Sequence, residues 1–88
     1  MGFTFVDYPI QTPQQLAKVL RGFRKRNRLT QSQAGSKAGL LPKTISGLEA
    51  APERASVASL FRLLSALQIE FVLRDKDGAA EPSSPSYW

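Results

Sequence analysis

The chain has 88 residues, a net charge of +5 and neither cysteine nor histidine. A chain of this length forms one small domain with a modest core, so we expect chains to associate. The missing thiols and imidazoles exclude disulfides, thiol nucleophiles and Cys or His metal sites. We therefore predict that the protein is not an enzyme and has no catalytic residue, metal, cofactor or small-molecule substrate.

The charge is unevenly distributed along the chain. Residues 1–48 hold eight Lys or Arg against one acidic residue, a balance of +7, whereas residues 49–88 hold four against six, a balance of −2. A polyanion such as nucleic acid would therefore meet the N-terminal half. No apolar run approaches the ~20 residues that cross a bilayer, so we expect a cytoplasmic protein with no membrane partner.

Residues 1–11 precede the first helical pattern. Phe3, Phe5 and Ile10 stand among polar neighbours. This spacing predicts a short strand or an extended arm that packs on the domain.

A first helix is predicted from Thr12 to about Asn27. Thr12 and Gln15 form the pattern of a capping box, and Pro13 suits the first helical position. Gly22 either permits a close approach or weakens the helix. The apolar residues that share one face are Leu16, Val19, Leu20 and Phe23.

Residues 29–51 have the spacing of two short helices around a tight turn. Thr30 can cap a helix over residues 31–38, Gly39 can end it, and Pro42 can begin the next. Such short helices need packing to be stable, which is typical of a helix-turn-helix. The inward candidates are Ala34, Ala38, Leu40, Ile45 and Leu48.

A fourth helix is predicted after Pro52, which closes the third, with Ser56 as its N-cap. Its apolar positions at helical spacing predict one buried stripe. They are Val57, Leu60, Phe61, Leu64 and Leu67.

Residues 68–77 have the pattern of a strand and a turn. Ile69, Phe71 and Leu73 alternate with polar or smaller residues. An isolated strand leaves its backbone groups unpaired, so it needs a partner. Residues 3–7 of the same chain could pair with it, but we favour a sheet between two copies related by a two-fold axis. Residues 78–88 are rich in Ala, Pro and Ser, which predicts a flexible tail.

Residues 16–67 resemble the DNA-binding domains of the lambda repressor and Cro (XRE) family. The resemblance rests on the Thr-Gln-x-x-Ala pattern from Thr30 and the Ile-Ser-x-x-Glu pattern that ends at Glu49. It implies a structural ion pair between Arg24 and Glu49. The predicted fold is mainly α, a four-helix domain over residues 12–67 that is followed by the dimerisation strand and the tail.

One branch of that family, the HipB-type antitoxins, is similar over nearly the whole chain. The shared features are the leading arm, Thr-Gln-Ser at 30–32, Thr-Ile-Ser-x-x-Glu at 44–49, Pro-Glu-Arg-Ala-Ser at 52–56, the strand and a terminal Trp. The resemblance implies a homodimer that represses its own operon and binds a HipA-type serine/threonine kinase toxin. It also implies that Trp88, with Tyr87 beside it, contacts the toxin.

The start of the third helix is the predicted reader of double-stranded operator DNA. In helix-turn-helix proteins this end enters the major groove. Lys43 can donate to a guanine or to a phosphate, and these two alternatives stay open. The base-contact candidates are Pro42, Lys43, Thr44, Ser46 and Gly47; the phosphate-contact candidates are Gln31, Ser32, Arg54 and Arg28. Pro42 and Gly47 stand where the family often has long polar side chains, so fewer residues are left for hydrogen-bonded readout.

Two other functions fit the same residues. A stand-alone phage or chromosomal repressor would have the same fold and no toxin partner. An adaptor would use its basic face to bind an acidic protein, without preference for a DNA sequence.

Overall fold

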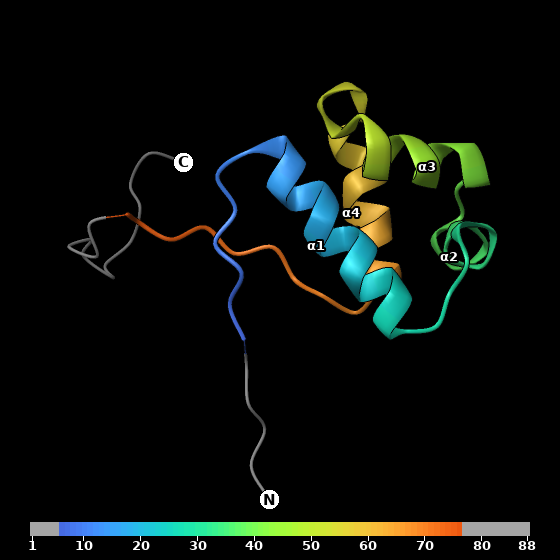
Figure 1. Cartoon of the computed structure of the whole chain (residues 1–88), viewed down its shortest axis with the longest axis horizontal. Helices are drawn as coiled ribbons and strands as arrows, with labels where there is room; N and C mark the ends of the chain where they lie inside the picture. Colours follow the sequence, from blue (N-terminus) through green and yellow to red (C-terminus); the bar gives the residue numbers. More distant parts are fainter. Residues whose placement is uncertain (1–5, 77–88) are drawn as a thin grey trace, which may run out of the picture.

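The computed structural model describes residues 6–76 of the chain. In this range the chain forms α1 (Pro13–Arg26), α2 (Gln31–Ala38), α3 (Pro42–Ala50), the 3-10 helix η1 (Pro52–Arg54) and α4 (Val57–Ala66) (Figure 1). α2 packs against α3 and α4, and α1 packs against α3 and η1. The predicted mainly helical fold with four helices is confirmed, and η1 replaces part of the predicted loop. Predictions for Phe3, Phe5, Tyr87 and Trp88 lie outside the described residues.

Side-chain caps begin three of the four α-helices. The Thr12 hydroxyl accepts from the Gln15 N–H at 3.1 Å, and the Gln15 side chain accepts from the Thr12 N–H at 3.2 Å. Thr30 and Gln33 form a second capping box, with distances of 3.0 and 2.9 Å. The Ser56 hydroxyl caps α4. These contacts confirm all three predicted N-caps, because the capping chemistry is local to each sequence.

Three helices end with a residue in the left-handed conformation. Gly39, at φ 70°, follows α2 as predicted, but Arg28 and Gln68 adopt φ 58° and 59° without being glycine. In each case the next N–H bonds back to the helix, as for Leu29 to the Arg24 carbonyl at 3.1 Å. This pattern is the Schellman motif. It turns the chain within a few residues and keeps the connections between helices short.

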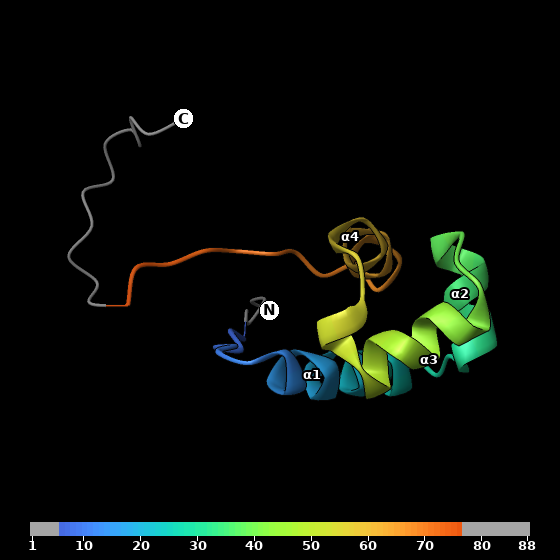
Figure 2. The same cartoon turned by 90° about the horizontal axis from the view of Figure 1, so that it is seen from above.

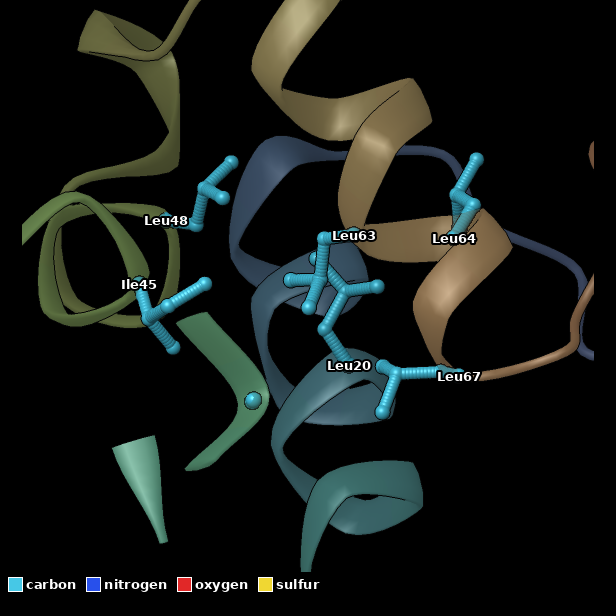
Figure 3. Close-up of a cluster of buried hydrophobic side chains, with 7 residues drawn as sticks. Leu20, Ile45, Leu48, Leu63, Leu64 and Leu67 are labelled. Atoms are coloured by element: carbon cyan, nitrogen blue, oxygen red, sulfur yellow. The ribbon is translucent and has the colours of Figure 1, made fainter. Parts of the chain in front are cut away.

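The core lies where all four α-helices meet, as Figure 3 shows. Leu20 of α1 meets Ile45 and Leu48 of α3 and the leucines of α4, and α2 adds Ala34, which is fully buried. The small Ala34 side chain lets α2 approach its neighbours closely. The buried cluster consists of Leu20, Ala34, Ile45, Leu48, Leu63, Leu64 and Leu67.

The buried face of α4 differs from the prediction. Val57 and Phe61 were expected in the core, but they are 67% and 50% exposed. Leu63, which was not predicted, is buried instead. The apolar positions of α4 form an arc over almost half of the helix circumference. This arc is wider than the part of the helix that contacts the core. One edge of this apolar arc is therefore left uncovered by residues 6–76.

Two helical glycines have different surroundings. A Cβ atom at Gly22 would meet nothing within 4 Å, so no close approach within the described chain requires glycine there. A Cβ atom at Gly35 would lie 2.5 Å from the Leu40 carbonyl oxygen. Gly35 therefore permits the tight approach of the turn to α2, in addition to weakening the helix.

Residues 6–11 form an arm that crosses the extended segment after α4 (Figure 1). The Tyr8 ring meets the Phe23 ring of α1 edge-on, with 5.5 Å between centroids. Asp7 and Arg74 lie 3.5 Å apart at an exposed contact, which contributes little to stability. The contact of the arm with α1 is thus made by Tyr8, which was not among the apolar residues singled out from the sequence.

Residues 69–75 run away from the helices as an extended segment (Figure 2). The predicted strand is not formed here, since residues 6–76 contain no strand pairing. The physical reason is the one expected from the sequence: a strand needs a partner, and the part of the chain that the structure describes offers none to these residues.

Candidate nucleic-acid interface

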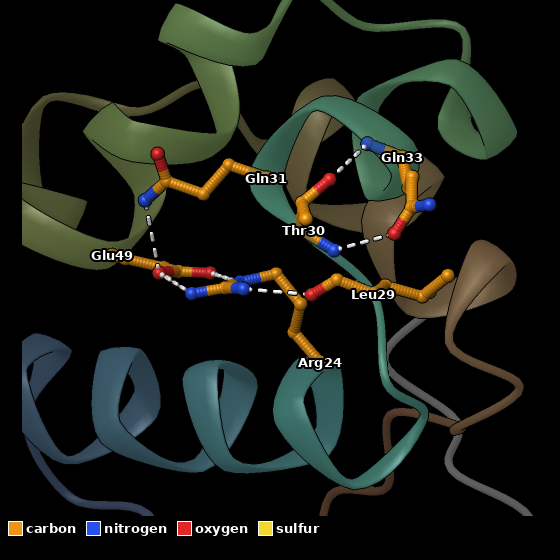
Figure 4. A network of polar contacts seen from close by, with 6 residues as sticks. All are labelled: Arg24, Leu29, Thr30, Gln31, Gln33 and Glu49. Carbon is orange, nitrogen blue, oxygen red and sulfur yellow. Dashed lines mark hydrogen bonds and ion pairs between the residues drawn. The ribbon is translucent and has the colours of Figure 1, made fainter.

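A buried polar network holds the helix-turn-helix together (Figure 4). Arg24 of α1 donates from Nε to Glu49 Oε2 at 2.6 Å and from Nη2 to Glu49 Oε1 at 3.1 Å. The Gln31 amide at the start of α2 donates to Glu49 Oε1 at 3.2 Å. One carboxylate in the last turn of α3 thus joins three helices, and the implied pair of Arg24 and Glu49 is present.

Arg24 also fixes the connection between α1 and α2. Its Nη1 donates to the Leu29 carbonyl at 2.8 Å, while the Leu29 N–H donates to the Arg24 carbonyl. The hydrogen bond to Glu49 raises the pKa of Arg24, while its burial lowers it by a smaller amount. Arg24 therefore stays charged, and its guanidinium has partners on all three nitrogens.

The start of α3 is open to solvent. Pro42 and Lys43 are exposed, and Thr44, Ser46 and Gly47 are partly buried along the helix. A Cβ atom at Gly47 would meet nothing within 4 Å, so the backbone there is accessible to a partner. The five base-contact candidates thus occupy one short helix whose far end is fixed by Glu49.

The phosphate-contact candidates come from three places. Gln31 and Ser32 begin α2, Arg28 lies in the connection before it, and Arg54 is exposed in η1. The Gln31 side chain bonds to Glu49, so a contact from its side-chain amide nitrogen would have to share that group. The Thr30 hydroxyl accepts from the backbone N–H of Gln33. The backbone N–H groups of Gln31 and Ser32 have no partner within residues 6–76. Such N–H groups can bind an anion.

The dimerisation candidates do not share one environment. Ile69 is partly buried against the core, directly after α4. Phe71 is 50% exposed and packs on Phe61, with 5.8 Å between ring centroids, and Leu73 is 85% exposed. Phe71 therefore continues the uncovered apolar edge of α4, Leu73 is exposed on the segment that leaves the helices, and Ile69 packs against the core.

Sequence reasoning missed two residues near the turn. The close contact at Gly35 was not predicted, and Leu41, an exposed leucine directly before α3, was not considered. A signal for Leu41 was present, because an apolar residue before Pro42 occupies a position where capping favours a polar one. No sequence pattern indicates the close contact at Gly35, since it depends on the backbone of Leu40.

Two other kinds of site are absent from the described residues. Residues 6–76 contain no group of three acidic, His or Cys side chains that could hold a metal ion. In the same range no helix combines the length and the apolar character that crossing a membrane requires.

Four helices with this turn and this polar network define a helix-turn-helix domain. No family model matches the sequence. Antitoxin HipB of Escherichia coli K12 is 32% identical over 75 residues, which cover 85% of each chain. Antitoxin HipB of Escherichia coli O6:H1 is 34% identical over 71 residues, which cover 81% of this chain and 76% of the relative. The chain therefore belongs to the HipB antitoxin family.

Solved structures agree with this assignment. A HipA-HipB-O2-O3 complex contains a chain with a TM-score of 0.76 and 31% identity, and the match covers 80% of this chain and 99% of that one. A HipB-O4 20mer complex has the same TM-score, identity and coverage. The match extends over most of the chain.

Proposed function

We propose that this protein is an antitoxin and transcriptional autorepressor. It binds palindromic operator DNA as a homodimer and also binds a HipA-type serine/threonine kinase toxin. The observation that carries the proposal is the open start of α3, held by the Arg24 and Glu49 pair, in a chain of the HipB family. HipB relatives occur in complexes with HipA and with operator fragments, which supports both partners.

The DNA-binding surface is assigned to residues 12–67. Lys43 is the exposed cation at the start of α3, and Thr44 and Ser46 supply hydroxyls to base edges or phosphates. The open N–H groups of Gln31 and Ser32, together with Arg28 and Arg54, supply phosphate contacts. An α-helix fits the major groove. The basic charge balance of residues 1–48 favours binding to a polyanion.

Dimerisation is assigned to residues 68–77. The exposed aromatic pair of Phe61 and Phe71 and the extended segment beside it form an apolar surface with unpaired backbone. A second copy would pair the segment and bury both rings, which supplies the stability that a domain of this size lacks. The two-fold axis of such a dimer matches a palindromic operator.

Replacing Lys43 by alanine is expected to weaken operator binding by about 1 to 3 kcal/mol if Lys43 reads a base. Competition against random duplex measures this, because loss of a base contact lowers the affinity for the operator but not the affinity for random duplex. A phosphate contact would instead give a uniform loss and a salt slope reduced by about 1. Lys18→Ala, which removes the same charge from the exposed face of α1, is the control. Unchanged operator affinity in Lys43→Ala would contradict the assigned surface.

Deleting Tyr87 and Trp88 is expected to leave operator binding unchanged and to weaken toxin binding by at least about tenfold. Tryptophan and tyrosine are frequent hot spots of interfaces, and each is worth more than about 2 kcal/mol when it is one. Calorimetric titration with the purified kinase measures the loss. Deleting Ser83 and Ser84 shortens the chain equally and keeps both aromatic residues. Unchanged toxin affinity would exclude the aromatic contact, and no kinase binding at all would favour the stand-alone repressor.

A further inference from the structure

Leu41 breaks a local rule at the start of α3. Its backbone is the N-cap, and its carbonyl accepts from the N–H groups of Thr44 at 2.9 Å and Ile45 at 3.2 Å. Its side chain cannot cap the helix, although Ser, Thr, Asp and Asn are favoured there. The other α-helices follow the rule, with Thr12, Thr30 and Ser56 as caps. Residues that break local rules are often functional.

The Leu41 side chain is also large, apolar and 66% exposed. It does not join the core cluster, unlike its neighbour Leu40, which packs against that cluster. The backbone around it is held in place, because its carbonyl accepts two hydrogen bonds and the turn packs closely against Gly35. The chain therefore holds an isobutyl group at a defined place beside Pro42 and Lys43, facing outward.

We propose that Leu41 contacts the C5-methyl group of a thymine in each operator half-site. The inference rests on the proposed DNA-binding function and specifies the readout at that surface. The major groove offers one apolar group, the thymine methyl, and apolar side chains discriminate thymine through it. Pro42 and Gly47 cannot donate from their side chains, so apolar readout supplies sequence information that polar contacts at this helix lack.

The test replaces thymine by deoxyuridine, which removes the methyl group and keeps every hydrogen-bonding group. The probe is the duplex that the purified full-length protein selects from a random-sequence library. Each thymine of one half-site is replaced in turn, and then the symmetric pair is replaced. At one position of the half-site we expect the affinity to fall about fourfold when one thymine is replaced and about fifteenfold when the symmetric pair is replaced. These losses correspond to the burial of one methyl carbon at each contact.

Leu41→Ser separates the contact from other effects of the methyl group. Serine is a preferred N-cap, so this variant is expected to fold at least as well as the parent. It should be insensitive to deoxyuridine at the position that affects the parent, and it should keep its affinity for random duplex. Lys18→Ala, on α1, should keep the parent's sensitivity.

Two results would overturn the inference alone. A selected duplex that tolerates deoxyuridine at every position would exclude a methyl contact. Equal sensitivity of the parent and Leu41→Ser would assign the methyl contact to another residue. Failure to select any duplex would overturn the DNA-binding function itself and this contact with it.

Discussion

Replacing Glu49 by alanine is expected to lower the free energy of unfolding by about 3 kcal/mol, the lower end of the range for breaking a buried ion pair. The Glu49 carboxylate accepts two hydrogen bonds from Arg24 and one from Gln31. The Arg24 and Glu49 side chains are only 11% and 6% exposed. Without the carboxylate, the guanidinium would stay charged in a site that water reaches poorly. Since the total free energy of unfolding of a small domain is about 5 to 15 kcal/mol, this is a large loss.

Urea unfolding at a fixed protein concentration, followed by helical circular dichroism, measures the change. Glu53→Ala removes an exposed glutamate from η1, and it is expected to change the stability by less than about 0.5 kcal/mol. The double variant Arg24→Met with Glu49→Leu should be more stable than Glu49→Ala, because no unpaired charge is left. If Glu49→Ala unfolded at the same urea concentration as Glu53→Ala, the pair would not be holding the three helices together.

This network also determines how α3 is presented to a partner. α3 has only 9 residues, and Glu49 lies in its last turn. An isolated helix of this length is unstable, so its direction depends on contacts with its neighbours. The first turn, with Lys43 at its solvent side, is oriented through Glu49 by the ends of α1 and α2. Replacing Glu49 is therefore expected to reduce sequence-specific binding to DNA as well as the stability of the domain.

The helix starts could be predicted from the sequence because their chemistry is local. Thr12, Thr30 and Ser56 each cap a helix through a group three residues away, and this spacing is visible in the sequence. Gly39 ends α2 for a similarly local reason. Arg24 and Glu49 are 25 residues apart, and no local pattern joins them. Their pairing could be predicted only from the resemblance to the lambda repressor and Cro family.

The predictions that failed depended on what surrounds a residue. The spacing of apolar residues in α4 showed that one side is apolar, but it did not show which edge of that side the core covers. Val57 and Phe61 were therefore placed in the core, and Leu63 was omitted. The Gly35 contact depends on where the Leu40 carbonyl lies after the turn. Alternation in residues 68–77 indicates a strand, but its partner has to come from outside the segment.

Replacing Phe71 by glutamate is expected to convert the proposed dimer into monomers and to weaken operator binding by at least about 100-fold. Phe71 packs on Phe61 at the uncovered edge of α4, where a second copy would bury both rings. A carboxylate in that interface would be desolvated without a partner, which costs several kcal/mol. A monomer binds one half-site, so it loses the contribution that linkage of two half-sites makes, about 100-fold to 10,000-fold. Sedimentation equilibrium and gel shift with a full palindrome measure both effects.

Val72→Glu is the matched control, because it places the same charge on the next residue of the same segment. Side chains alternate along an extended segment, so Phe71 and Val72 point to opposite sides. If the segment pairs with its copy while Phe71 covers α4, Val72 faces solvent, and Val72→Glu should stay dimeric and bind the palindrome like the parent. Loss of the dimer in both variants would mean that both sides of the segment are buried. A dimeric Phe71→Glu would place the interface elsewhere and leave the exposed pair of Phe61 and Phe71 for another partner.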